Sequence, residues 1–283
     1  MILMSQMTRY VVFTDLDGTL LDADTYSFTE ALPALEALRA RGIPLVLVSS
    51  KTRAEMEPLR RRLRHRGPFI VENGAAVFIP HGYFDFPIVR SRVKSCYDVI
   101  ELGLPYYMLR DVLKQIEDAV ETPIKGFGDL SVDEVMQLTN LSRTDAMLAQ
   151  IREYDEPYLL EGPPALVEEV CRQIITRGLR WTKGGRLFHL TGDNDKGEAT
   201  ELLLRCYRRQ QRLRDRPDRV ESVGIGDGVN DAPLLAAVDY PILVQKPDGS
   251  YDPDIHIGGL TKAQGIGPAG WNHAIMSLLA PHT

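Results

Sequence analysis

The stretch Tyr10-Val11-Val12-Phe13-Thr14-Asp15-Leu16-Asp17-Gly18-Thr19-Leu20 decides the fold of this chain. Its opening residues are apolar or β-branched and predict a buried strand. The strand ends in two carboxylates one residue apart, Asp15 and Asp17, followed by Gly18. Because ligands of open α/β sheets bind beyond the carboxyl ends of the strands, both carboxylates are expected at the mouth of a site. A polar turn without a function is the alternative that this stretch alone leaves open.

The composition is typical of a globular protein with a sizeable core: 283 residues, 44% hydrophobic and 25% charged. The formal net charge of -6 disfavours a nucleic-acid coat. The arginines between 60 and 66 predict a solvated helix face, because no aromatic residue interleaves with them. No apolar run approaches the ~20 residues of a membrane helix. The three cysteines are widely spaced and the start lacks a signal peptide, so we expect a cytoplasmic protein.

Strands and helices alternate along much of the chain. A helix is predicted over 32–42, between two apolar strand segments joined to it by short links. Strand, helix and strand in this order imply a parallel pair with a right-handed crossover. The sequence therefore predicts an α/β fold with a Rossmann-like parallel-sheet core. The buried strands of this core are predicted at 10–14, 44–48, 69–71, 220–225 and 240–244.

The middle of the chain has a different pattern. Helices, two of them opened by the capping residues Ser131 and Ser142, are followed by short paired strands, which indicates an α+β unit. We predict an inserted α+β domain at 85–190, within a core formed by residues 1–84 and 191–283. The expected elements around and within the insert are a hairpin of 75–79 with 84–89, helices at 105–120, 142–154 and 163–177, and a hairpin of 179–182 with 186–190.

Three of the predicted strands end in polar clusters, which a parallel sheet brings to one edge. Carboxylates without His or Cys suit a hard cation with oxygen ligands, which indicates Mg²⁺. A lysine and hydroxyl groups beside them suit a phosphate, and a carboxylate can attack phosphorus to give an aspartyl-phosphate. The bound metal would offset the repulsion between the two anions. The clusters are Asp15 with Asp17, Ser49–Lys51, and Asp227 with Asn230 and Asp231, and Lys196 begins a helix ahead of the third.

The run D-L-D-G-T, a strand-end serine, a following lysine and G-D-G-V-N-D, in this order, resemble the motifs of haloacid dehalogenase superfamily phosphatases. In the same resemblance the inserted segment is similar to a C2-type cap. The implied roles are Asp15 as nucleophile, Asp17 as general acid/base and Lys196 as the neutralising cation; Ser49, Ser50 and Asn230 at the phosphate; and Mg²⁺ on Asp15, the backbone carbonyl of Asp17 and Asp227, with Asp231 in support.

Within that superfamily, V-E-N-G-A, S-S-K-T and the run 140–158 resemble mannosyl-3-phosphoglycerate phosphatases. This resemblance implies hydrolysis of mannosyl-3-phosphoglycerate to mannosylglycerate, a compatible solute, and phosphate. A sucrose-phosphate or general sugar-phosphate phosphatase, a phosphosugar mutase and a non-catalytic binding protein stay open as alternatives. The candidates for contact with the sugar-glycerate substrate are Lys51, Arg143, Arg152, Lys183, Gly184, Gly185 and Arg186.

Overall fold

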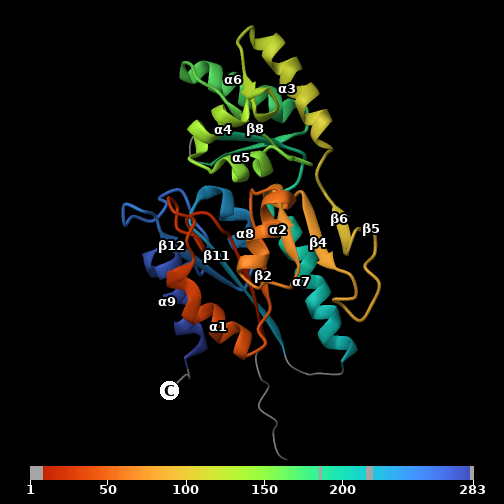
Figure 1. Cartoon of the computed structure of the whole chain (residues 1–283), viewed down its shortest axis with the longest axis vertical. Helices are drawn as coiled ribbons and strands as arrows, with labels where there is room; N and C mark the ends of the chain where they lie inside the picture. Colours follow the sequence, from red (N-terminus) through yellow and green to blue (C-terminus); the bar gives the residue numbers. More distant parts are fainter. Residues whose placement is uncertain (1–8, 185–186, 215–218, 281–283) are drawn as a thin grey trace, which may run out of the picture.

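The computed structural model describes residues 9–184, 187–214 and 219–280, which form a larger and a smaller lobe (Figure 1). A nine-stranded sheet forms the centre of the larger lobe, in the order β13-β12-β11-β1-β2-β3-β4-β6-β5. The first six strands in this order run parallel, and the last three are antiparallel. Their bounds are β1 Arg9–Thr14, β2 Leu45–Val48, β3 Phe69–Val71, β4 Ala76–Pro80, β5 Arg92–Lys94, β6 Tyr97–Glu101, β11 Val220–Gly226, β12 Tyr240–Gln245 and β13 Thr261–Ile266.

Helices cover both faces of this sheet, because alternate side chains of the central strands point to opposite sides. Val12 of β1 packs in the apolar cluster with α1, α2 and α9, whereas Val11 and Phe13 pack with α7 and α8. Trp271 of α9 is fully buried, and its indole N–H donates to the Thr14 hydroxyl at 2.9 Å. The helices are α1 Leu32–Ala40, α2 Arg53–Arg62, α7 Lys196–Leu213, α8 Ala232–Ala236 and α9 Gly267–Leu279.

The smaller lobe has its own four-stranded sheet, in the order β7-β8-β10-β9, with antiparallel pairing throughout. Its apolar core, which includes Tyr158 and Phe188, packs between this sheet and the helices α3 and α6. Among the described residues, no helix is both long and apolar enough to cross a membrane. The bounds are α3 Tyr106–Val120, β7 Lys125–Gly126, α4 Val132–Thr139, α5 Arg143–Ala149, β8 Glu156–Leu159, α6 Pro164–Thr176, β9 Arg180–Gly184 and β10 Leu187–Thr191.

The α/β fold with a large parallel sheet is as predicted, but one hairpin prediction was wrong. β4 pairs with β6, and not with the segment 84–89. That segment carries aromatic side chains that pack on α7, where the Phe84 ring centroid lies 5.1 Å from that of Tyr207. Burial of these rings against α7 takes the place of the strand pairing that was predicted for this segment.

The predicted start of the insert at 85 precedes two strands, β5 and β6, that belong to the large sheet. The chain enters the smaller lobe after β6 and leaves it after β10, ahead of α7. The helix capped by Ser142 ends at Ala149, shorter than the predicted 142–154. The residues after it contact the larger lobe instead, as in the hydrogen bond between the Arg152 guanidinium and the Ser50 carbonyl at 3.0 Å.

Candidate active site

The loop after β1 turns sharply and carries Asp15 and Asp17. The Asp15 N–H donates to the Ile225 carbonyl at 2.9 Å, so this residue continues the pairing of β1 with β11. Gly18 has a φ of +79°, in the left-handed region. A Cβ atom on Gly18 would lie 2.8 Å from Asp227 Oδ2. This close approach requires glycine, and it brings the first and third polar clusters together.

Lys196 is a buried cation between two carboxylates. Its Nζ lies 2.6 Å from Asp15 Oδ1 and 2.6 Å from Asp231 Oδ1, and the residue is 1% exposed. Burial opposes its charge, but the two carboxylates outweigh burial and raise the pKa of Lys196. Asp195 caps α7 by accepting the Gly197 N–H at 2.8 Å, which fixes the turn that carries the lysine.

The loop after β11 completes a group of three carboxylates. Asp231 Oδ2 accepts the Asp227 N–H at 3.0 Å, and Thr19 Oγ1 donates to Asp227 Oδ1 at 3.1 Å. Oxygen atoms of Asp15, Asp227 and Asp231 lie within 4.8 Å of one another. Burial and then repulsion from Asp231 raise the pKa of Asp227 to about 7, and the same causes raise the pKa of Asp15 against the effect of Lys196. Three carboxylates beside one ammonium group therefore suit a divalent cation with oxygen ligands.

The cluster after β2 lies against Asp17. Ser49 is buried and its Oγ accepts the Lys51 N–H at 3.1 Å. Lys51 Nζ lies 2.9 Å from Asp17 Oδ2, 3.9 Å from Glu55 Oε1 and 5.0 Å from the centroid of the Tyr26 ring. Within the described residues, the buried Oδ1 atom of Asp17 has no hydrogen-bond partner. A predicted substrate residue, Lys51, thus contacts the predicted acid/base, and one oxygen of Asp17 stays open to a ligand or proton.

A cavity of about 360 Å³ lies beside Lys196, between the larger lobe and β9. Asn230 lines it from the larger lobe, and Arg180, Trp181 and Thr182 line it from the smaller one. Apolar side chains, among them Ile175, Leu179 and Val229, complete the wall, so the cavity suits an organic ligand with both polar and apolar surface. Of the predicted phosphate ligands, Asn230 is therefore on the cavity wall, and Ser49 is in the loop that contacts Asp17.

The other predicted substrate residues have different surroundings. Arg143 is exposed and lies 2.5 Å from Asp133. Lys183 Nζ lies 5.0 Å from the ring centroid of Phe188, the residue it faces across the β9–β10 pair, and that ring packs in the apolar core of the smaller lobe. In this structure, neither cation contacts the carboxylate group around Lys196. The remaining predicted residues are Gly184, which ends β9, and Gly185 and Arg186, which lie outside the described residues.

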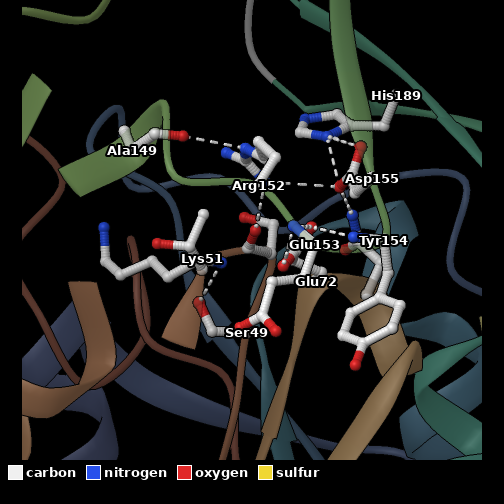
Figure 2. Close-up of polar contacts among 12 residues, drawn as sticks. Ser49, Lys51, Glu72, Ala149, Arg152, Glu153, Tyr154, Asp155 and His189 are labelled. Carbon is white, nitrogen blue, oxygen red and sulfur yellow. Dashed lines mark hydrogen bonds and ion pairs between the residues drawn. The ribbon is translucent and has the colours of Figure 1, made fainter. Parts of the chain in front are cut away.

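A buried polar cluster joins the two lobes, and most of it was not predicted from the sequence (Figure 2). Asp155 accepts a hydrogen bond from His189 Nδ1 at 2.9 Å and lies 3.7 Å from Arg152 Nη1. Glu72 is fully buried, and burial raises its pKa to about 8 against the opposing effect of Arg152. Only Arg152 was among the candidates. The available signal was the acidic Glu72 directly after a buried strand, within the V-E-N-G-A run that was used only for the family resemblance.

Comparison with known proteins agrees with this geometry. The haloacid dehalogenase-like hydrolase family matches residues 12–103. A glucosyl-3-phosphoglycerate/mannosyl-3-phosphoglycerate phosphatase of Methanococcoides burtonii is 46% identical over 96% of this chain and 97% of its own length. A mannosyl-3-phosphoglycerate phosphatase of Pyrococcus furiosus is 38% identical over 83% of this chain and 90% of its own length.

Solved structures share the fold at much lower identity. A protein of Thermoplasma acidophilum superposes with a TM-score of 0.66 at 16% identity, covering 96% of this chain and 99% of that one. A haloacid dehalogenase-like hydrolase of Bacteroides thetaiotaomicron gives 0.65 at 16% identity, covering 96% and 100%. The chain therefore belongs to the haloacid dehalogenase-like hydrolases and, among them, to the family of the phosphatases from Methanococcoides burtonii and Pyrococcus furiosus.

Proposed function

We propose that this phosphatase hydrolyses a glycosyl-3-phosphoglycerate, with mannosyl-3-phosphoglycerate as the expected substrate and the glucosyl ester as a second one. The observation that carries the proposal is the buried Asp15–Lys196–Asp231 group with Asp17 beside it, in a chain that aligns over nearly its full length with phosphatases named for these esters. The products are the glycosylglycerate and inorganic phosphate.

The reaction proceeds in two steps at the D-x-D pair. A carboxylate oxygen of Asp15 attacks phosphorus, the P–O bond to the glycerate breaks, and Asp17 gives its proton to the departing alkoxide. A water then attacks the phosphorus of the aspartyl-phosphate, and Asp17 takes its proton, which regenerates Asp15 and releases phosphate. Lys196, 2.6 Å from Asp15 Oδ1, balances negative charge during both steps. Ser49 and Asn230 hold the phosphoryl oxygens, with Ser50 as a second candidate.

The cluster of Asp15, Asp227 and Asp231 fits Mg²⁺ as the cofactor. Its donor atoms are all oxygens, and its three negative charges exceed the single positive charge of Lys196. Asp15, Asp227 and the backbone carbonyl of Asp17 would hold the ion. Asp231 acts in support, since Lys196 contacts its Oδ1 and the Asp227 N–H contacts its Oδ2. When bound, the ion supplies charge neutralisation between the nucleophile and the phosphate.

Substrate choice belongs to the smaller lobe, which we propose acts as a C2-type cap. The catalytic groups recognise only a phosphate and its leaving oxygen, and they do not distinguish one monoester from another. The lobe adds a cavity wall with an indole, a guanidinium group and a hydroxyl group beside Lys196. Lys51, whose Nζ lies 2.9 Å from Asp17 Oδ2, is at the edge of the catalytic cluster and is the preferred partner for the glycerate carboxylate.

Phosphate release measured with four esters at equal Mg²⁺ tests this function. We expect kcat/KM for mannosyl- and glucosyl-3-phosphoglycerate to exceed that for mannose 6-phosphate and sucrose 6-phosphate by at least about a hundredfold, or ~2.7 kcal/mol. Equal values would contradict the substrate proposal while leaving the phosphatase chemistry standing. Return of the phosphoryl group to a second sugar without net phosphate release would indicate a mutase.

A further inference from the structure

The turn Glu72–Gly74 has an unusual backbone. Three successive residues have positive φ angles: +46° at Glu72, +57° at Asn73 and +91° at Gly74. Non-glycine residues in the left-handed region are uncommon, and two in succession persist only where surrounding contacts hold them. Gly74 is required by packing as well, because a Cβ atom there would lie 2.0 Å from the Asp195 carbonyl oxygen. The turn is therefore fixed by its neighbours on several sides.

On one side, the turn holds the loop after β2. The Glu72 N–H donates to the Lys51 carbonyl at 3.0 Å, and the Asn73 N–H donates to the Ser49 carbonyl at 3.0 Å. Ser49 is the proposed phosphate ligand, and Lys51 contacts the carboxylate of Asp17. The position of these two backbone carbonyls therefore depends on the position of the turn.

On the opposite side, the same turn holds the smaller lobe through its side chains (Figure 2). The Glu72 carboxylate accepts the Glu153 N–H at 3.1 Å and the Tyr154 N–H at 2.8 Å. The Asn73 side-chain amide donates to Asp155 at 2.9 Å. All three partners belong to the short segment between α5 and β8, so this segment is seated on the turn by buried polar contacts.

The third contact of the turn is with α7. The Asn73 carbonyl accepts a hydrogen bond from the Asn194 side chain at 3.3 Å, and Gly74 packs against Asp195. Asp195 is the N-cap of the helix whose first residue is Lys196. A single turn of three residues therefore contacts three parts of the protein. They are the loop after β2 that holds Ser49 and Lys51 (the phosphate loop), the smaller lobe, and the N-cap of the helix that begins at Lys196.

We propose that Glu72 and Asn73 are positioning residues that couple the seating of the smaller lobe to the geometry of Ser49 and Lys51. This inference rests on the proposed phosphatase function of the site. A substrate that reaches the smaller lobe stabilises the seated segment 153–155, and the turn carries that stabilisation to the phosphate loop. A small phosphate ester, which does not reach the lobe, gains nothing from the coupling.

Two substitutions at Glu72 form a graded test. Glu72→Gln keeps one acceptor oxygen for the backbone N–H groups of the lobe, and Glu72→Met keeps the length of the side chain but no oxygen. Glu153→Gln is the matched control, because it removes the ion pairs of that side chain with Arg53 and Lys94 but keeps the backbone N–H. If Glu72→Met does not fold, the comparison of Glu72→Gln with the control remains decisive.

The kinetic measurement compares mannosyl-3-phosphoglycerate with glycerol 3-phosphate, a small alkyl ester, at pH 9, where Glu72 is ionised because its pKa is about 8. We expect Glu72→Gln to lower kcat/KM at least tenfold for the large ester and less than twofold for the small one, with a larger loss in Glu72→Met. Glu153→Gln should change neither value more than twofold. An equal loss for both esters would mean general damage to the core, and no loss for either would remove the coupling; both results would overturn the proposal.

Amide hydrogen exchange tests the coupling without any substrate. The N–H groups of Glu153 and Tyr154 report the seating of the lobe, and those of Glu72 and Asn73 report the grip on the phosphate loop. In Glu72→Gln, both pairs should exchange faster, by similar factors. Faster exchange in the lobe pair alone would overturn the coupling. If the wild-type chain released no phosphate from any ester, the function would fail while this exchange result still decided the inference.

Discussion

Replacing Lys196 by methionine should destabilise the metal-free protein strongly. The lysine is 1% exposed and its Nζ lies 2.6 Å from both Asp15 and Asp231, with Asp227 in the same carboxylate group. Methionine fills a similar volume but leaves these buried carboxylates without the ammonium group. Removal of one partner from a buried ion pair costs about 3–5 kcal/mol. For a protein of this size, that loss corresponds to a fall in Tm of roughly 6–20 °C.

The assay is urea unfolding of both proteins at pH 7 with a chelator present, repeated at a saturating Mg²⁺ concentration. Lys114→Met is the matched control, because Lys114 Nζ lies 3.2 Å from Glu117 Oε2 in the smaller lobe but the Lys114 side chain is 47% exposed. We expect that control to lose less than about 1 kcal/mol. Mg²⁺ should stabilise Lys196→Met more than the wild type, since the variant site carries one more net negative charge. Turnover should nevertheless be lost.

The same unfolding experiment, repeated at several pH values, has an expected direction. Burial and mutual repulsion already raise the pKa values of Asp15 and Asp227, and loss of Lys196 should raise them further. The folded variant then binds protons more tightly than the folded wild type, so its stability deficit should shrink as the pH falls from 8 toward 5. A deficit below about 1 kcal/mol in chelator, or one that grows on acidification, would refute this reasoning about charge balance.

Three further outcomes are expected. Asp15→Asn should lose more than about a hundredfold in the rate of phosphate release, since an amide does not form the acyl-phosphate, and a smaller loss would contradict the nucleophile assignment. Because burial raises the pKa of Glu72 from its ordinary 4.5 to about 8, the free energy of unfolding should fall as the pH rises through this window. The free energy of unfolding should change by at most ~1.4 kcal/mol per pH unit. Urea titrations at several pH values should show a smaller slope for Glu72→Gln than for the wild type. Equal slopes in the two proteins would argue against a buried Glu72 carboxyl. Gly74→Ala should lose at least about 2 kcal/mol of stability, because its φ is +91° and the new Cβ would lie 2.0 Å from the Asp195 carbonyl oxygen. Gly42→Ala has open space at its Cβ and should lose about 1 kcal/mol. Calorimetric unfolding of the two variants compares these losses.

The convergence of the carboxylates at one edge of the sheet was predictable because these residues follow buried strands directly. Asp15 and Asp227 directly follow β1 and β11, which are neighbours in the sheet, so apolar runs followed by acidic residues determine their convergence. Lys196 was found by its order in the motifs, and its burial between two carboxylates agrees with that position. The local hydrophobic pattern locates the strand ends, and the parallel topology places those ends at one edge of the sheet.

The missed elements lack a strong local pattern. β13 (Thr261–Ile266) is a mostly polar edge strand, and its pairing depends on β12 rather than on its own composition. β5 is exposed throughout. Of the arginines predicted on a solvated helix face, Arg61, Arg62, Arg64 and Arg66 are exposed. Arg60 is the exception: it is buried, donates to the Tyr97 hydroxyl at 2.6 Å, and its guanidinium carbon lies 4.1 Å from the ring centroid of Phe69. The structure of these segments depends on contacts with residues distant in sequence, which a short stretch of sequence does not contain.

Asp15 and Asp17 each pair with a lysine, but one lysine begins a helix and the other lies in a loop. Lys196, beside Asp15, begins a long capped helix and is almost fully buried. Lys51, beside Asp17, lies in a loop whose carbonyl is held by the Glu72 N–H. If Asp15 is the nucleophile and Asp17 the acid/base, the fixed partner serves bond formation at phosphorus. On the coupling proposed above, seating of the smaller lobe then acts on proton transfer through Lys51 and on the binding of the phosphoryl group through Ser49, whereas Lys196 keeps its place in both states of the lobe.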